Sequence, residues 1–304
     1  MVSFMLSELM HISLFSSFLR WTRSITLTAS LALSSILWAE VSTSKLPVLT
    51  GTDVITVEST SVGDSFTIYV RLPPEAVAEP ERTFPVIYTL DGDHTFPLVA
   101  SVTTQLGWTG SVPPVILVGI GYGTLDLENG NHRSRDLSPQ PFAGRPDSGG
   151  GPAFHSFLIK ELFPLLESSY PIDSESRYLF GHSLGGLFAL YTYAKSPEHF
   201  KGIVAGSPFL AGQLNLLSET ADGSEQRACR LFIITGDEED ATYFIDDLKP
   251  LGAAIETWAT PDSFEIVLLP GFDHFSMVAP AISKGLKVVF AEKLITSGAR
   301  NSQM

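Results

Sequence analysis

A serine framed by glycines is the feature of this sequence best suited to covalent chemistry. The string GHSLGG at 181–186 contains the pattern G-x-S-x-G, in which a sharp strand-to-helix turn pushes the serine hydroxyl out of a sheet. An apolar strand pattern precedes it at 178–180, and a helical pattern follows at 187–194. We therefore expect Ser183 to be a nucleophile. The alternative is a glycine-rich turn that serves only close helix–strand packing.

A serine hydroxyl needs a positioned base to accept its proton. Enzymes built on this turn place the serine, the acid and the histidine in that chain order. Of the seven histidines, only His199 and His274 follow Ser183. His199 lies in a polar segment near a helix end, whereas His274 lies in a loop directly after the last strand pattern. We predict that His274 is the base; a loop histidine held by Asp273 is the alternative.

The acid is expected after the strand pattern that precedes the last one, at 231–235. Four carboxylates follow that strand at 237–240, and most must face water because neighbouring like charges raise each other's pKa. Only one can orient the histidine ring. The third position after the glycine, Glu239, is the expected one, with Asp240 and Asp237 as open alternatives.

Two backbone amides are candidates for holding the oxyanion that forms on the attacked carbonyl. One belongs to Leu184, directly after the nucleophile, and the other to Asp93, in the turn LDGD at 90–93. The carboxylates of that turn are expected to brace it.

Three further residues are candidates for contact with a substrate. Arg135 stands beside Arg133 in a long loop and could grip an anionic group, although a pair with Asp136 is an equal alternative. His94 is either a pocket residue or an exposed loop histidine, and Ser207 is expected to line the cleft.

These residues need a scaffold in which strands and helices alternate. Two alternating polar and apolar strand patterns come first, at 53–59 and 65–72. Near-continuous apolar runs follow at 85–90, 115–120, 177–180, 202–205, 231–235 and 265–269, which is typical of a parallel sheet covered on both faces. Helical patterns occupy 154–168, 184–195 and 277–294. We predict an α/β-hydrolase fold with about eight strands, most of them parallel, and helices on both faces. The irregular segments 121–151 and 213–228 are expected to be loops near the site.

The first 39 residues read as a secretory signal peptide, with bases at Arg20 and Arg23 followed by a short apolar stretch. The prediction is export, with residues 40–304 as one catalytic domain. An uncleaved anchor is one alternative, and a misassigned start with a cytoplasmic protein is another, since Met5 and Met10 are also available. After cleavage of the signal we expect no stable membrane insertion.

The composition narrows the possible partners. The chain has 304 residues, 33 acids against 19 Lys and Arg, and a net charge of −14, which argues against binding nucleic acid or an anionic membrane surface. A single cysteine, Cys229, excludes an internal disulfide framework and a zinc site of several cysteines. No dinucleotide, Walker or H-E-x-x-H motif is present, and we expect neither metal nor organic cofactor.

Several strings resemble the putative-esterase family of α/β-hydrolases, which includes esterase D and S-formylglutathione hydrolases. The branch they resemble most is that of the siderophore esterases, which open trilactones such as enterobactin and bacillibactin. The strings are VIYTLDGD at 86–93, RSRDLSP at 133–139, the run at 149–173, GHSLGGLFAL at 181–190, AGSPFL at 205–210 and the late Asp273-His274. The resemblance implies Ser183, His274 and Glu239 as catalytic residues and Arg135 directed at the substrate. Members often carry an aromatic pair after the Ser-Pro motif, whereas Phe209-Leu210 stands here.

The expected function is hydrolysis of a small carboxylic ester through an acyl-serine. An acyltransferase of the same fold and a non-catalytic exported ligand-binding domain are the alternatives. The sequence does not indicate an oligomeric state.

Overall fold

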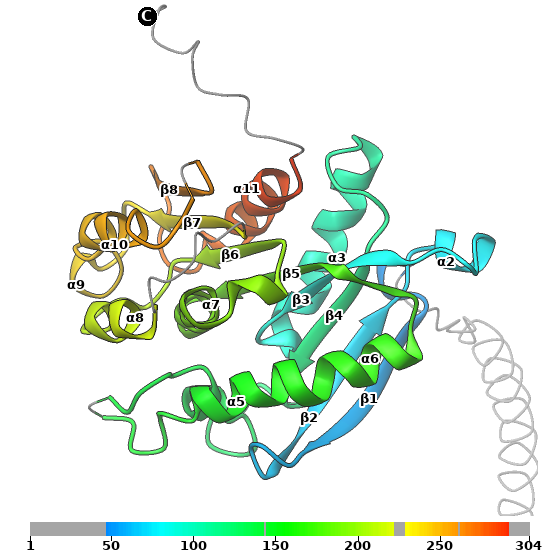
Figure 1. The fold of residues 1–304 in the computed structure, drawn as a ribbon, viewed down its shortest axis with the longest axis horizontal. Helices are drawn as coiled ribbons and strands as arrows, with labels where there is room; N and C mark the ends of the chain where they lie inside the picture. Colours follow the sequence, from blue (N-terminus) through cyan, green and yellow to red (C-terminus); the bar gives the residue numbers. More distant parts are fainter. Residues whose placement is uncertain (1–46, 143, 222–228, 261, 292–304) are drawn as a thin grey trace, which may run out of the picture. The chain divides into compact units, whose positions relative to one another are not determined.

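An eight-stranded sheet forms the centre of the protein. The computed structural model describes residues 47–142, 144–221, 229–260 and 262–291, so the predicted signal peptide at 1–39 lies outside the described residues. The strand order is β1-β2-β4-β3-β5-β6-β7-β8 (Figure 1). β2 is antiparallel to β1 and β4, and all other neighbours are parallel. The strands are β1 (Thr52–Ser59), β2 (Asp64–Arg71), β3 (Phe84–Thr89), β4 (Ile116–Gly121), β5 (Ile172–His182), β6 (Gly202–Gly206), β7 (Arg230–Gly236) and β8 (Phe264–Leu269).

The burial of each strand follows its sequence pattern. Every residue of β4 and β6 is buried, as the unbroken apolar runs indicate. The two edge strands β1 and β8 keep several exposed residues. Because neighbouring side chains on a strand point to opposite faces, the central strands build two cores, and in β3 Val86 and Tyr88 enter one while Ile87 enters the other.

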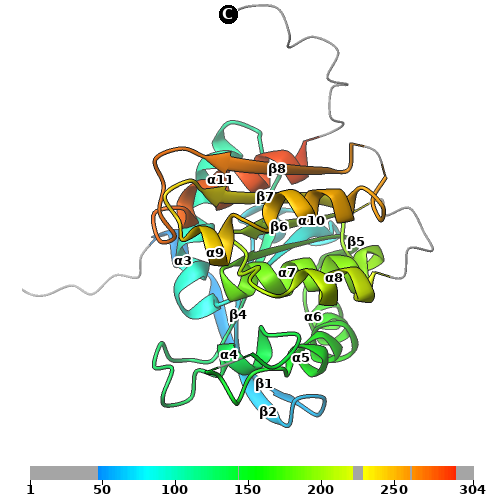
Figure 2. The same cartoon turned by 90° about the vertical axis from the view of Figure 1, so that its left-hand side faces the viewer.

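Helices cover both faces of the sheet (Figures 1 and 2). Helices α5 (Gly151–Phe157), α6 (Phe163–Ser169) and α7 (Leu184–Lys195) pack on one face, with α8 (Leu214–Thr220) and α10 (Leu248–Ile255) beside them. Helices α3 (Gly92–Trp108) and α11 (Val278–Phe290) pack on the other. The remaining short helices are α2 (Glu75–Ala78), α4 (Arg133–Asp136), α9 (Ala241–Phe244), and the 3-10 turns η1 (Pro47–Leu49) and η3 (Pro197–His199). The predicted fold is confirmed.

Several helices differ from the sequence expectation. Helices α4 and α8 lie in the segments 121–151 and 213–228, which we expected to be loops. The segment predicted as one helix at 154–168 is divided by a π-helical turn, η2 (Leu158–Leu162), directly before the first turn of α6. Pro164 stands in that turn, and proline has no N–H for an intrahelical bond and crowds the preceding turn. Helix α3 was not predicted at all, because it begins at a glycine and contains Pro97. No described helix is long and apolar enough to cross a membrane.

Candidate active site

Ser183 lies at the turn between β5 and α7, with φ 60° and ψ −119°. This is a backbone conformation that non-glycine residues rarely adopt, so the surrounding structure must hold it. A Cβ on Gly181 would lie 2.1 Å from the carbonyl oxygen of Gly185, and one on Gly186 would lie 2.7 Å from that of Gly206. The glycines therefore allow two chain segments to approach the turn closely.

Glu239 and His274 meet beside this turn. Glu239 Oε2 lies 2.7 Å from His274 Nδ1. Because a carboxylate only accepts hydrogen bonds, Nδ1 carries the proton, and Nε2 is left able to accept one. The rings of His274 and His182 have centroids 4.6 Å apart, so the base lies next to the residue that precedes Ser183.

The second oxygen of Glu239 is also held. Glu239 Oε1 accepts from the Ser207 hydroxyl at 2.5 Å and from the Gly236 amide at 2.8 Å. Burial by itself would raise the pKa of Glu239, but the hydrogen bonds from His274, Ser207 and Gly236 outweigh it and leave the pKa below its ordinary value. The carboxylate is thus ionised at neutral pH and fixed in orientation.

The two alternative acids serve the local backbone. Asp237 accepts from the amide of Gly271 at 2.7 Å. Asp240 caps helix α9 by accepting from the Thr242 amide at 3.0 Å. Neither has a hydrogen bond to His274 among the described residues, so Glu239 is the acid that the geometry favours.

The two candidate oxyanion donors are first-turn amides of helices. Leu184 is the first residue of α7 and Asp93 the second of α3, positions at which a backbone N–H has no intrahelical acceptor. The side chain of Asp93 braces the turn, since it accepts from the Tyr69 hydroxyl at 2.7 Å and the Tyr122 amide at 2.7 Å. A Cβ on Gly185 would lie 3.3 Å from the carboxylate of Asp91, so this turn faces the start of α7.

Arg133 and Arg135 of the long loop are paired inside the protein. Arg135 binds Asp136 through Nε at 2.8 Å and Asp64 through Nη1 at 2.9 Å. Arg133 binds both oxygens of buried Asp91, at 2.7 and 2.9 Å. This is the internal pairing that the sequence left open as the alternative to a substrate contact.

The other two predicted pocket residues differ in their surroundings. The side chain of His94, in the first turn of α3, is exposed. Ser207 is fully buried and touches Glu239. Ser207 therefore holds the carboxylate of Glu239 in place. The Gly-Ser-Pro string does not indicate this role by itself.

Aromatic rings around His274 were not predicted. Phe244 lies against its ring at a centroid distance of 4.3 Å, and Phe275, 85% exposed, at 5.3 Å. Phe209 stacks on Tyr243 at 5.6 Å. The adjacent aromatic residues Tyr243 and Phe244, which follow the acidic turn, could have indicated this aromatic group from the sequence.

His182 adds a buried ring to the same group. Its Nε2 is buried and has no hydrogen-bond partner in the described part of the chain. Burial, the largest cause, lowers the pKa of His182 to about 4, so the ring is neutral at pH 7 and no second positive charge builds up beside His274.

Comparison with known proteins shows which family the chain belongs to. A profile of the family described as "Putative esterase" matches residues 59–263. Ferri-bacillibactin esterase BesA of Bacillus subtilis is 34% identical over 179 residues, which cover 55% of this chain and 61% of BesA. Apo-salmochelin esterase of Escherichia coli is 33% identical over 141 residues, 43% of each protein. These matches thus span less than two thirds of either relative.

The fold comparison covers more of the chain. The crystal structure of BES protein from Bacillus cereus superimposes with a TM-score of 0.68 and 25% identity, over 83% of this chain and 99% of that protein. Siderophore hydrolase EstA from Aspergillus nidulans gives a TM-score of 0.68 at 21% identity, over 84% and 99% of the two chains. With the family profile spanning most of the chain, this protein belongs to the putative-esterase family of α/β-hydrolases.

Proposed function

We propose that this protein is a serine esterase that hydrolyses carboxylic esters through an acyl-enzyme on Ser183. The observation that carries the proposal is the hydrogen bond of 2.7 Å between Glu239 and His274, beside a serine held at φ 60°. A nucleophile, a base and an orienting acid in this order and arrangement are the minimum set for acyl transfer.

The reaction proceeds in two halves. Ser183 Oγ attacks the ester carbonyl carbon while His274 Nε2 accepts the hydroxyl proton, and the amides of Leu184 and Asp93 hold the oxyanion. The bond to the leaving alcohol breaks as His274 returns the proton to its oxygen. Water then attacks the acyl-serine, His274 accepts a proton from it, and the carboxylic acid leaves as Ser183 regains its hydrogen. Glu239 keeps the ring oriented and stabilises its charged form.

The proposed substrate is a trilactone siderophore or a similar small ester. Two relatives support this proposal, because they are named as esterases of ferri-bacillibactin and apo-salmochelin. The aromatic side chains Phe244, Tyr243 and Phe275 around His274 suit a substrate with aryl groups. Because Arg133 and Arg135 are already neutralised by carboxylates, we propose that they position the loop and do not bind the substrate.

Replacement of the acid tests the mechanism. Glu239→Gln keeps the shape but cannot hold the ring tautomer or its charged form, and kcat should fall roughly 10²–10⁴-fold with little change in KM. Asp240→Asn, in the same acidic turn, is the matched control and should stay within about twofold of wild type. Wild-type kcat in Glu239→Gln would remove Glu239 from the mechanism.

A substrate panel tests the specificity. Purified protein is assayed on short-chain and long-chain nitrophenyl esters and on a tri-catechol trilactone with and without ferric iron, with Ser183→Ala as control. Preferential trilactone cleavage that Ser183→Ala abolishes supports the siderophore assignment. Cleavage of nitrophenyl esters alone keeps the esterase and refutes the trilactone.

We also propose that the protein is exported. The support is the basic and apolar pattern of residues 1–39. Expression of the full chain in a bacterial host, with N-terminal sequencing of the cell-envelope and secreted fractions, should give a mature protein that begins near Glu40. An intact N-terminus found only in the cytoplasm would refute the proposal.

A further inference from the structure

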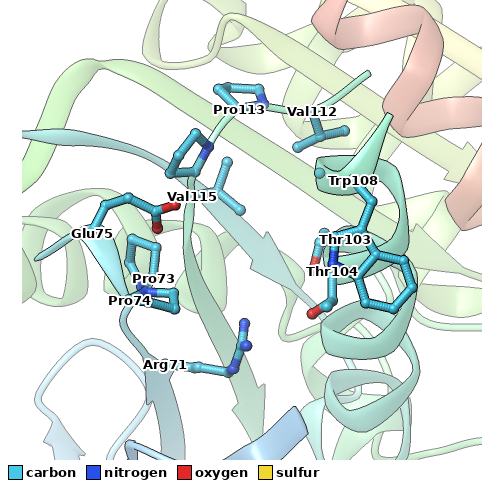
Figure 3. A pocket seen from close by; sticks show the side chains of 12 residues that line it. Arg71, Pro73, Pro74, Glu75, Thr103, Thr104, Trp108, Val112, Pro113 and Val115 are labelled. Atoms are coloured by element: carbon cyan, nitrogen blue, oxygen red, sulfur yellow. The ribbon is translucent and has the colours of Figure 1, made fainter. Parts of the chain in front are cut away.

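A cavity lies at the other end of the parallel strands from the catalytic residues. It has a volume of about 270 Å³ and is bounded by the end of β2, the last turns of α3 and the segment before β4 (Figure 3). Arg71, the last residue of β2, pairs with Leu117 near the start of β4, whereas Ser183 follows the carboxyl end of β5. Because β4 and β5 both run parallel to β3, the cavity lies at the amino ends of these strands and Ser183 at their carboxyl ends.

Arg71 lines this cavity, and its side chain forms no ion pair or hydrogen bond in the described part of the chain. Arg71 Nε is buried and has no hydrogen-bond partner within the described residues. Partial burial of the side chain lowers the pKa of Arg71, and no carboxylate in the described part of the chain pairs with it. Arg133 and Arg135, in contrast, are both paired with carboxylates.

A glutamate, Glu75, lies on the same cavity. Glu75 lines the cavity together with Arg71, is only partly exposed, and forms no ion pair or side-chain hydrogen bond among the described residues. The neighbouring Glu79 does bind Arg82, at 3.2 Å. Pro73 and Pro74 stand directly before Glu75, and their fixed φ angles restrict the backbone that connects it to Arg71.

The rest of the cavity is lined by threonine hydroxyls, which can accept hydrogen bonds, and by the flat apolar surfaces of prolines and a tryptophan. The hydroxyls of Thr103 and Thr104 donate to the carbonyls of Val99 and Ala100, each at 2.8 Å, so their oxygens can only accept from a ligand. Trp108, 81% exposed, lies on the opposite side of the cavity from the prolines (Figure 3).

We propose that this cavity binds a small aromatic zwitterion, namely a free α-amino acid such as phenylalanine. Its carboxylate pairs with Arg71, its ammonium group with Glu75 and a threonine oxygen, and its ring lies between Trp108 and Pro113. Two opposite charges that share a cavity without pairing are satisfied together by a ligand with the two complementary charges. The cavity is slightly below the range of about 300–1,000 Å³ of small-molecule sites, which fits a ligand of this size. The proposal does not depend on ester hydrolysis at Ser183.

Calorimetric titration of the purified full chain tests the inference with three probes of one shape. Phenylalanine carries both charges, 3-phenylpropionate lacks the ammonium group, and phenethylamine lacks the carboxylate. We expect saturable binding of one phenylalanine and at least about tenfold weaker binding of each of the other two, a difference of about 1.4 kcal/mol. Equal binding of the three probes, or no saturable binding of phenylalanine, would overturn the proposal.

Substitutions locate the site. Arg71→Gln and Glu75→Gln should each weaken phenylalanine binding at least about tenfold, whereas Arg71→Lys, which keeps the charge, should retain part of it. Arg82→Gln and Ser183→Ala are controls that should bind as wild type does, and thermal melting verifies that each variant is folded. Phenylalanine binding that survives in both Arg71→Gln and Glu75→Gln, or that is lost in Ser183→Ala, would place the ligand elsewhere and refute the site.

Discussion

The two oxygens of Glu239 have different partners. Oε1 accepts from Ser207 and Gly236, and Oε2 faces His274. With Oε1 held by two donors, the carboxylate cannot rotate without losing both hydrogen bonds. The orientation of the His274 ring therefore depends on Ser207, which acts through Glu239.

We predict that Ser207→Gly lowers kcat about tenfold and leaves KM near its wild-type value, because a hydrogen bond to a charged group contributes roughly 1.5–3 kcal/mol. Glycine suits the φ of 40° at this position, so the hydroxyl is removed without new strain. Steady-state kinetics on an aryl ester measures the effect. Ser196→Ala, at a buried serine that binds His155, is the control, and an unchanged kcat in Ser207→Gly would contradict the account.

For single residues, the sequence predicts a role where the residue belongs to a motif or follows a recognisable strand. Ser183 follows from G-x-S-x-G, and the positions of His274 and Glu239 follow from chain order and strand ends. The contact of Ser207 with Glu239 depends on how the turns after β6 and β7 meet, and no local pattern encodes that. The same holds for Arg135, whose partner Asp64 is 71 residues away.

Among the elements, the junction of α5 with the end of α7 contains a buried histidine. His155 on α5 hydrogen-bonds Ser196, directly after α7, at 2.7 Å. Burial, the largest cause, lowers the pKa of His155 to about 4. Between that value and about 6.5, the ordinary value for histidine, the unfolded chain binds more protons at this residue than the folded chain.

His155 therefore makes stability depend on pH. Its contribution is complete above about pH 6.5 and is lost as the pH falls toward 4, with a loss of about 1–2 kcal/mol by pH 5. His155→Gln does not titrate, so its melting temperature should fall less between pH 7 and pH 5 than that of wild type. Identical profiles for wild type and His155→Gln would refute this role.

Strands were easier to predict than helices. The apolar runs of β3, β4, β6 and β7 come from burial on both faces, and that constraint is visible locally. Helix α3 is stabilised by its packing against β4 and α11, and tertiary packing can override a proline in the helix. Sequence periodicity alone therefore left α3 out.

Charge acts on the whole molecule. The net charge is −14, and the loop arginines near the site, Arg133 and Arg135, are bound to carboxylates. The protein as a whole therefore repels anions, and the guanidinium groups of Arg133 and Arg135 are not free to offset the repulsion.

We predict that an anionic aryl ester is a poorer substrate than a neutral one and improves with salt. Between about 0.01 and 0.3 M NaCl, kcat/KM for the nitrophenyl ester of succinate should rise roughly threefold because salt screens the repulsion, while that for nitrophenyl acetate stays constant. Initial rates across this salt range measure both. A fall with salt for the anionic ester would indicate a cationic binding group and would return Arg135 to the substrate.

The central claim is that Ser183 is a nucleophile activated by His274. The most direct measurement is the intact mass of the protein after treatment with a fluorophosphonate, followed by peptide mapping. A single adduct on Ser183, formed by displacement of fluoride, absent in Ser183→Ala and much slower in His274→Ala, is the predicted result. An adduct on another residue, or ester hydrolysis that continues in a protein whose Ser183 does not react, would contradict the account.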